Sequence, residues 1–350
     1  MDRPCLPRRS RSLRVFDYLI FIGRFQPYHL GHQSVIAEAL RQSRHVIVLL
    51  GSANLPRSTR NSFSVAERQQ MILESFSPEQ ALRIRCVALR DSLYNDIRWV
   101  TDVQQAVTSV VGDDPTAKIG LIGHAKDRSS YYLSLFPHWQ SVSVPNYHNL
   151  SATPIRDSYL LGAMPQPSDV PNSTLQCLQQ FKQTAQFGVL QEEAWFIDKY
   201  KKQWERSPYP PTFVTVDAVV VQAGHILLVE RQAMPGRGLW ALPGGFIHTK
   251  ESLLDACIRE LREETRLKVP DPVLRGSMHA QRTFDDPYRS ARGRTITQAF
   301  YFELRSTPEG LPKVRGADDA KRAFWLPLSQ LDATQLFEDH YAIICAMAGL

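Results

Sequence analysis

The segment from Gly245 to Leu267 constrains this chain more than any other, because its charged residues keep a fixed spacing. Five residues separate Gly245 from Glu251, and seven more precede the run Arg259-Glu260-Leu261-Arg262-Glu263-Glu264. On a helix, Glu260, Glu263 and Glu264 stand at positions i, i+3 and i+4, so their carboxylates share one face and repel one another. A divalent cation among them would remove that repulsion, and all-oxygen ligands suit Mg²⁺ or Mn²⁺ rather than zinc. The spacing therefore predicts a metal-binding helix on which Arg259 can hold Glu263 in place.

The same segment, which follows Leu239-Trp240-Ala241-Leu242-Pro243-Gly244, resembles the Nudix box. That motif marks hydrolases that cleave a nucleoside diphosphate linked to another group. The resemblance implies a metal ion held mainly by Glu260 and Glu264, with Glu263 and Gly244 in support, and catalytic roles for Glu263 and Glu264. Arg266 departs from the family, whose glycine ends the helix in a left-handed conformation that costs a residue with a Cβ roughly 1 to 2 kcal/mol. The alternative interpretation is an exposed helix that carries Arg and Glu pairs.

A second signature lies near the N-terminus, where an apolar run predicts a buried parallel strand, Tyr18-Leu19-Ile20-Phe21-Ile22. A glycine-containing turn follows directly, and a helical pattern then runs from Gln33 to Gln42. A strand, a tight turn and a helix start bring backbone N–H groups and the helix dipole toward a phosphate. His29 and His32 stand three residues apart at this helix start and can contact the same polyphosphate. We discount a zinc site, because no cysteine or acidic residue stands nearby at ligand spacing.

The run His29-Leu30-Gly31-His32 resembles the HxGH motif of nucleotidyltransferases. In that family the two histidines hold the ATP phosphates and stabilise charge while the α-phosphorus is attacked. The run Ser151-Ala152-Thr153-Pro154-Ile155-Arg156 resembles the second family motif, Ser-x-Thr-x-x-Arg, which closes over the phosphates from the opposite side. From the residues alone, Thr153 can cap a helix with Pro154 in its first turn, which leaves N–H donors and Arg156 for phosphate oxygens.

Residues between these motifs look like the archaeal-type branch of the nicotinamide mononucleotide adenylyltransferases. They are Gly23-Arg24-Phe25-Gln26-Pro27, Asn61-Ser62-Phe63-Ser64 with Glu67-Arg68, and Asp91 with Tyr94-Asn95-Asp96 and Trp99. The resemblance implies catalytic roles for His29, His32, Arg24 and Arg156, and substrate contacts by Gly23, Phe25, Gln26, Gly31, Asp91, Asn95, Ser151 and Thr153. Trp99 would be an aromatic platform for the nicotinamide ring, although a tryptophan at helical spacing is nearly as often a core residue. The run Ile122-Gly123-His124-Ala125-Lys126-Asp127 resembles the adenosine-side loop and adds Gly123, Lys126 and Asp127.

Together the two signatures resemble the bacterial bifunctional nicotinamide mononucleotide adenylyltransferase and Nudix hydrolase proteins over almost all of residues 16–350. Strand-like runs that alternate with helical patterns predict a Rossmann-like, doubly wound parallel sheet for the first domain. Its later strands are expected at 46–50, 84–87, 119–122 and 142–144, followed by a helical region over 175–205. The resemblance implies an α/β/α Nudix domain with a mixed sheet. Strands are expected there at 214–221, 226–229, 295–304 and 324–326, with a C-terminal helix near 338–347.

The expected organisation is a basic tail over 1–15, a nucleotidyltransferase domain over 16–206, a linker over 207–211 and a Nudix domain over 212–350. The linker is the run Ser207-Pro208-Tyr209-Pro210-Pro211, which breaks any helix. We interpret the tail as disordered or as an overlong start. It carries much of the net charge of +6, and nucleotides are polyanions, so the charge requires no nucleic-acid partner.

Five cysteines without a CxxC pair indicate a reducing cytoplasm. No apolar stretch reaches the ~18 residues of a membrane span, so no membrane partner is expected. The sequence leaves a homo-oligomer open.

The resemblance implies that the first domain joins nicotinamide mononucleotide to ATP with Mg²⁺, giving NAD and pyrophosphate. It also implies that the second domain hydrolyses ADP-ribose to AMP and ribose 5-phosphate. The runs Phe284-Asp285-Asp286-Pro287-Tyr288-Arg289 and Arg292-Gly293-Arg294 resemble ADP-ribose pyrophosphatases, which assigns ADP-ribose contacts to Arg289 and Arg294. The general base stays open among Glu263, Asp318 and Asp319. The alternatives are another acceptor for the transferase, another nucleoside diphosphate derivative for the hydrolase, or a Nudix domain that senses a ligand without turnover.

Overall fold

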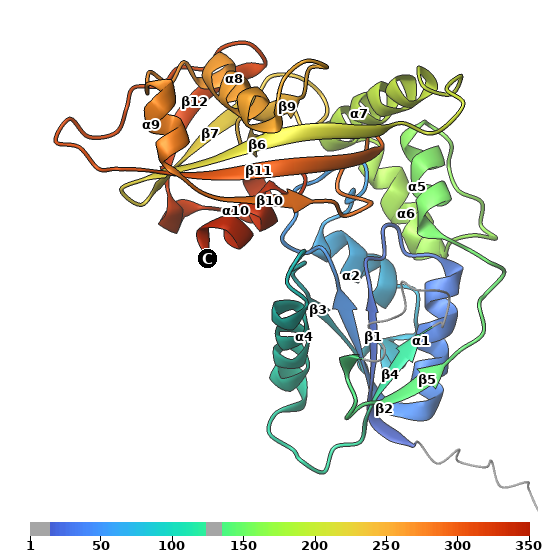
Figure 1. Cartoon of the computed structure of the whole chain (residues 1–350). Helices are drawn as coiled ribbons and strands as arrows, with labels where there is room; N and C mark the ends of the chain where they lie inside the picture. Colours follow the sequence, from blue (N-terminus) through green and yellow to red (C-terminus); the bar gives the residue numbers. More distant parts are fainter. Residues whose placement is uncertain (1–14, 124–134) are drawn as a thin grey trace, which may run out of the picture.

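The computed structural model describes residues 15–123 and 135–350. The predicted tail, apart from its last residue, therefore lies outside the described residues, as do Lys126 and Asp127. The described chain forms two sheets, one in each half of the sequence (Figure 1). Beside them lie the helices α5 (Ala152–Leu160), α6 (Asn172–Phe181) and α7 (Ala185–Lys202).

The first sheet has five parallel strands in the order β3-β2-β1-β4-β5. Leu19 and Phe21 of β1 face the core under helix α1, whereas Ile20 between them faces the core under helix α4. Because helices cover both faces, the central strands are apolar almost throughout. The predicted Rossmann-like, doubly wound sheet is confirmed. The bounds are β1 Phe16–Gly23, α1 Leu30–Gln42, β2 Ser43–Leu50, β3 Ile84–Ala88, α4 Asp96–Val111, β4 Ile119–Gly123 and β5 Gln140–Ser143.

The described residues of this half form five further helices. They are α2 Val65–Leu73, α3 Pro78–Ala81, α5 Ala152–Leu160, α6 Asn172–Phe181 and α7 Ala185–Lys202. The helical region expected over 175–205 is divided, because Thr184 starts a new helix: its side chain accepts a hydrogen bond from the N–H of Phe187 (3.2 Å). Residues 203–211 beyond α7 contain neither helix nor strand, and the expected linker lies among them. The domain boundary itself stays a prediction.

The second sheet is mixed, with the order β10-β11-β6-β7-β12 and two short strands, β8 and β9, paired to β7 and β6. Strands β6 and β11 are parallel, and the other pairs are antiparallel. Helix α8 covers one face and α10 the other (Figure 1), so the expected α/β/α arrangement is confirmed. The bounds are β6 Thr212–Gln222, β7 His225–Arg231, β8 Trp240–Ala241, β9 Gly244–Phe246, α8 Leu253–Thr265, α9 Asp271–Gly276, β10 Met278–Phe284, β11 Arg294–Leu304, β12 Ala320–Pro327 and α10 His340–Ala348, with 3₁₀ turns at Leu328–Gln330 and Ala333–Gln335.

Strand β10 was not predicted, because all but one of its side chains are exposed and its sequence lacks an apolar alternation.

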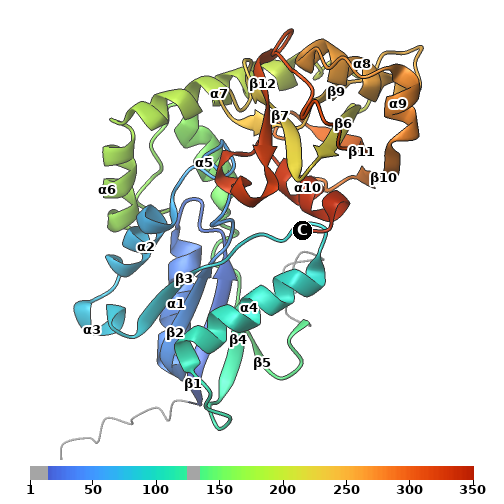
Figure 2. The same ribbon diagram turned by 90° about the vertical axis from the view of Figure 1, so that its left-hand side faces the viewer.

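Helix α7 extends from the helices beside the first sheet toward the second sheet (Figure 2). In the parts of the chain that the structure describes, no helix is both long and apolar enough to cross a membrane.

Candidate functional site

The turn after β1 lies at the carboxyl end of the first sheet, where the strand order reverses between β1 and β4. Doubly wound sheets bind ligands in the crevice at this point. His29 is the residue before α1, so Gly31 and His32 belong to the first helical turn, earlier than the expected start at Gln33. The N–H of His29 donates to Nδ1 of His32 (3.3 Å), and the two rings stack with their centroids 3.6 Å apart. A neutral His32 ring therefore carries its hydrogen on Nε2, where it can donate to an anion.

Glycine is required at two positions of this turn. A Cβ at Gly31 would lie 2.9 Å from the ring of His29, and a Cβ at Gly23 would lie 2.9 Å from the ring of Phe25. Both rings would have to move, so the two glycines let the turn close around the histidines.

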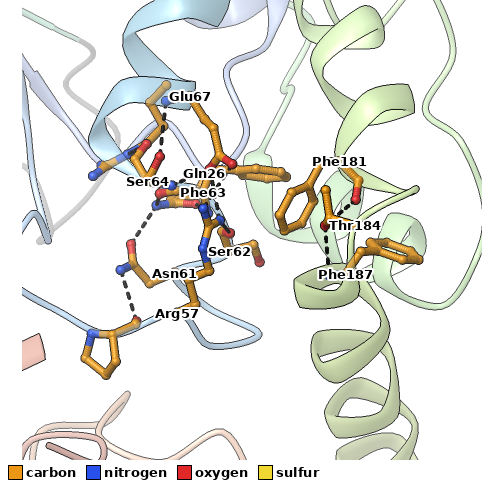
Figure 3. A network of polar contacts seen from close by, with 12 residues as sticks. Gln26, Arg57, Asn61, Ser62, Phe63, Ser64, Glu67, Phe181, Thr184 and Phe187 are labelled. Atoms are coloured by element: carbon orange, nitrogen blue, oxygen red, sulfur yellow. Dashed lines mark hydrogen bonds and ion pairs between the residues drawn. The ribbon is translucent and has the colours of Figure 1, made fainter. Parts of the chain in front are cut away.

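Two residues of this turn that were expected to bind substrate are buried. Phe25 and Gln26 are each 1% exposed. The amide of Gln26 donates to Oδ1 of Asn61 (2.6 Å) and to the carbonyl oxygen of Phe63 (2.8 Å), and its Oε1 accepts from the N–H of Phe63 (2.8 Å; Figure 3). Both N–H donors of the amide are thus engaged. From this position Gln26 ties the turn to segment 61–63.

The second phosphate motif lies at the start of α5. Its N-cap is Ser151, so the predicted cap at Thr153 is wrong by two residues. Thr153 and Pro154 lie within the first turn, where proline is tolerated because the first N–H groups have no partner inside the helix. Arg156 is 5% exposed, and its Nη1 donates to the carbonyl oxygen of Gln26 (3.0 Å). Its Nε is buried without a hydrogen-bond partner among the described residues, and a phosphate oxygen would supply the missing acceptor.

A cavity of about 780 Å³ collects Arg24, Arg60 and Arg156 beside Ser151 and Thr153. Burial lowers the pKa of Arg60 to about 10, with further contributions from the guanidinium groups of Arg24 and Arg156. Burial and Arg24 also lower the pKa of Arg156. Three cations that repel one another beside a helix N-terminus form a site for a polyanion. A role for Arg60 was not predicted from the sequence, although this residue directly precedes the Asn61-Ser62-Phe63-Ser64 motif.

The residues expected on the nicotinamide side are divided between a cavity and the core. Asp91 and Asn95 line a cavity of about 930 Å³, where Asp91 accepts hydrogen bonds from the N–H (2.9 Å) and Oγ (2.6 Å) of Ser52. Asn95 caps α4 through the N–H of Arg98 (2.9 Å). Trp99 packs against the core on α4, with its ring 6.1 Å from that of Phe136, which favours the core interpretation.

Gly123 ends β4, and its carbonyl oxygen accepts a hydrogen bond from the N–H of Val144 (3.1 Å). It thus stands at the same carboxyl end of the sheet as the turn after β1.

In the second half of the chain, Arg259 organises the acidic face of α8. Its guanidinium donates to Glu260 (2.8 Å) and Glu263 (3.0 Å) on the helix. It also donates to Glu251 (2.7 Å), which lies before the helix. The contact between Arg259 and Glu263 predicted from the spacing is confirmed. The helix ends at Arg266 in a left-handed conformation (φ 53°), as the comparison with glycine predicted.

The carboxylate of Glu264 contacts β9 instead: its Oε2 accepts a hydrogen bond from the N–H of Gly244 (3.0 Å). Burial raises the pKa of Glu264 to about 8, and the nearby charge of Glu260 contributes. A Cβ at Gly244 would lie 2.1 Å from the carbonyl oxygen of Val216, and one at Gly245 would lie 2.8 Å from the Glu260 carboxyl group. Both glycines therefore allow β9 to fit between β6 and α8.

These carboxylates are not arranged as a preformed metal site. Among the described residues, no three His, Cys, Asp or Glu side chains lie close enough together to hold a metal ion. Arg259 explains this, because it engages Glu260 and Glu263 itself. The donor set still fits a divalent cation. Burial is the largest cause that raises the pKa of both Glu260 and Glu264, and neighbouring carboxylates contribute, although Arg259 lowers the pKa of Glu260 in part.

Two family models match the chain, a cytidylyltransferase-like model over residues 20–158 and a NUDIX domain model over residues 211–347. The nicotinamide/nicotinic acid mononucleotide adenylyltransferase of Acinetobacter baylyi is 45% identical over 51% of this chain and 93% of its own length. The ADP-ribose pyrophosphatase of Methanocaldococcus jannaschii is 33% identical over 37% of this chain and 70% of its own length.

The chain is similar to a crystal structure from Francisella tularensis that is described as a bifunctional NMN adenylyltransferase/ADP ribose pyrophosphatase. The match covers 95% of this chain and 99% of the Francisella chain. It is 35% identical, with a TM-score of 0.89. A second structure from that organism, complexed with AMP and a Mn ion, has a TM-score of 0.87. The chain belongs to this bifunctional family.

In this bifunctional chain, the two arginines assigned to ADP-ribose occupy different places. Arg289 is 6% exposed and donates two hydrogen bonds to Asp339 (2.9 Å each), with Asp217 3.9 Å away. Arg294 pairs with Asp285 (3.6 Å) and lines the 780 Å³ cavity together with transferase residues. Their roles toward ADP-ribose stay predictions. Asp339 was missed from the sequence, because no motif marks a partner 50 residues away from Arg289.

Proposed function

We propose that this protein transfers the adenylyl group of ATP to nicotinamide mononucleotide and, at a second site, hydrolyses ADP-ribose to AMP and ribose 5-phosphate. The observation that carries the first activity is the polyanion pocket, where three guanidinium groups meet the N-terminus of α5 beside the turn that holds His29 and His32. The adenylyltransferase and pyrophosphatase relatives support this pair of reactions.

The adenylyl transfer needs no covalent intermediate. The phosphate oxygen of nicotinamide mononucleotide attacks the α-phosphorus of ATP, the new P–O bond forms, and the bond to the departing pyrophosphate breaks. Arg24, Arg156 and Nε2 of His32 donate to phosphate oxygens and stabilise the charge that moves onto pyrophosphate. The stacked imidazole of His29 keeps the His32 ring oriented for this contact.

For the hydrolysis, Glu260 and Glu264 would hold a divalent cation, with Glu263 and the Gly244 carbonyl in support. Mg²⁺ is the ion we propose, and Mn²⁺ the alternative, since both prefer oxygen ligands. The bound ion would polarise the pyrophosphate and activate water. The chain's own contribution is to place Glu264 against the backbone of Gly244 and to keep Glu263 oriented through Arg259.

The decisive test is mass spectrometry of the products formed from ATP, nicotinamide mononucleotide and ADP-ribose with Mg²⁺. We expect NAD, pyrophosphate, AMP and ribose 5-phosphate. His32→Ala should lower NAD formation by about a hundredfold or more and leave ADP-ribose hydrolysis intact, because removing one preorganised donor has that effect. The same exchange at the exposed His138 is the matched control. A folded His32→Ala variant that lost both activities would contradict two separate sites.

Glu264→Gln keeps the size of the side chain and removes one ligand charge. We expect hydrolysis to fall by orders of magnitude and its Mg²⁺ dependence to move to higher concentration, with NAD formation unchanged. Glu309→Gln in an exposed loop serves as the control. Hydrolysis at the wild-type rate with an unchanged metal profile would refute the assignment, and a wild-type protein that binds ADP-ribose without cleaving it would indicate a sensor.

A further inference from the structure

The polyanion pocket of the transferase domain is walled partly by the hydrolase domain. Arg24, Arg60, Ser151, Thr153 and Arg156 line one side of the 780 Å³ cavity. A segment of the hydrolase domain lines the same cavity with Pro287, Tyr288, Ser290, Ala291, Gly293 and Arg294. Arg60 and Tyr288 also line an adjoining cavity of about 150 Å³ between the same two halves of the chain.

Within this wall, Tyr288 makes two contacts with Arg60. Nη1 of Arg60 donates to the carbonyl oxygen of Tyr288 (2.5 Å), and its guanidinium carbon lies 5.0 Å from the centroid of the Tyr288 ring. A hydrogen bond and a cation–π contact together set the direction of a planar guanidinium. A guanidinium has five N–H donors, so this bond engages only one of them.

The backbone around Arg60 is also fastened to both halves of the chain. The buried carboxylate of Glu193 accepts a hydrogen bond from the N–H of Gly236 (3.1 Å), which belongs to the hydrolase domain, and the backbone of Thr59 acts on the pKa of the same carboxylate. On the other side, Asn61 accepts from Gln26 and donates to the carbonyl oxygen of Leu55 (3.2 Å). The contacts that turn the Arg60 guanidinium are the two with Tyr288, and the carboxylates of Asp286 and Asp91 also attract it.

Tyr288 is itself held in a short turn. Its N–H donates to Oδ1 of Asp286 (2.8 Å), and the next residue, Arg289, is anchored by two bonds to Asp339. The Tyr288 side chain is nevertheless 67% exposed, so it adds little to the core of the hydrolase domain. The Tyr288 side chain therefore acts mainly through its contact with Arg60 and contributes little through burial.

We propose that Tyr288 of the hydrolase domain is a positioning residue for the transferase reaction, because it holds Arg60 toward the phosphates of ATP. The inference rests on the proposed adenylyl transfer. It makes the ATP affinity of the transferase site depend on a residue of the other domain. The hydrolase domain thereby completes the pocket in which the first substrate binds.

The test compares Tyr288→Ala with Tyr288→Phe in the full chain. Phenylalanine keeps the ring and the backbone carbonyl, so this variant should retain the wild-type KM for ATP. Alanine removes the cation–π contact, and we expect the KM for ATP to rise about three- to tenfold, with kcat and the KM for nicotinamide mononucleotide little changed. Circular dichroism and the melting temperature of the same preparations control for folding, because Tyr288 lies in the run that resembles ADP-ribose pyrophosphatases.

A double-mutant cycle with Arg60→Ala separates positioning from a general structural effect. If Tyr288 acts through Arg60, its loss should have no further effect on the KM for ATP once Arg60 is absent. Calorimetric titration with ATP alone keeps the test valid if NAD formation fails, because it reports binding without turnover. Tighter ATP binding by Tyr288→Ala, equal effects of the Ala and Phe variants, or additivity with Arg60→Ala would overturn the proposal.

Discussion

His340 shows how burial sets the chemistry of a single residue in this protein. Its Nδ1 accepts a hydrogen bond from the N–H of Leu242 (2.9 Å), and its Nε2 lies 3.8 Å from Asp217. The pKa of His340 is lowered to about 3, mainly by burial; Asp339 opposes this shift, and the charges of Arg289, Arg231 and Arg292 add to it. The folded protein therefore requires the neutral ring.

From this we expect a pH-dependent loss of stability. The folded pKa of His340 is depressed below its unfolded value, so its contribution is fully present above about pH 6.5 and is lost as the pH falls toward 3. Between pH 7.5 and pH 5.5 the loss amounts to about 1.4 kcal/mol. His340→Asn keeps an acceptor for Leu242 without a titrating ring. The difference in unfolding free energy between the two proteins should shrink by this amount in urea titrations, and a constant difference would contradict the assignment.

At the scale of elements, helix α8 shows what local sequence determines well. Ser252 caps its start by accepting from the N–H of Asp255 (3.2 Å), and Arg266 ends it in a left-handed conformation. Such a conformation brings the Cβ close to the following carbonyl oxygen, which only glycine avoids. The helix thus keeps a strained end beside the acidic face on which we propose that a metal ion binds.

Arg266→Gly should therefore stabilise the protein by about 1 kcal/mol, partly offset by the greater freedom of glycine in the unfolded chain. Arg266→Ala is the matched control: it removes the same charge but keeps the Cβ, so it should gain little. Chemical denaturation followed by circular dichroism would measure both. A glycine variant no more stable than the alanine variant would show that Arg266 is unstrained.

The whole molecule is joined by contacts that cross between its two halves. The hydroxyl of Tyr94, which precedes α4, donates to Oδ2 of Asp339 (2.6 Å), and its ring packs edge-on against Phe284 at 4.9 Å. Asp339 in turn holds Arg289. Tyr94 in the first half of the chain and Asp339 and Arg289 in the second half thus share one hydrogen-bond network.

Tyr94→Phe keeps the ring and removes the bond to a charged acceptor, so it should lower the unfolding free energy by about 1.5 kcal/mol. Scanning calorimetry should show a lower melting temperature. Tyr209→Phe alters a hydroxyl on a side chain that is 81% exposed and should change nothing. A Tyr94→Phe melting curve identical to the wild type would show that the contact contributes no stability.

The elements and the chemistry of both motifs could be predicted from the sequence, because they depend on residues a few positions apart. The strands of the first sheet, the left-handed end of α8 and the contact between Arg259 and Glu263 are of this kind. Strand β10 was missed because it is almost entirely exposed, and the cap of α5 was misplaced because proline is tolerated anywhere in a first turn.

The sequence by itself determined which residue types stand at which spacing, and hence that this chain carries phosphate-binding and metal-binding motifs. Only the tertiary structure decided which side chains face the pockets. It joined Gln26 of the turn after β1 to Asn61, paired Arg289 with Asp339, and brought Tyr288 against Arg60, 228 positions away. The physical reason is that spacing on a helix or turn follows from local backbone geometry, whereas contacts between distant segments depend on how both sheets and their helices bury their apolar faces together.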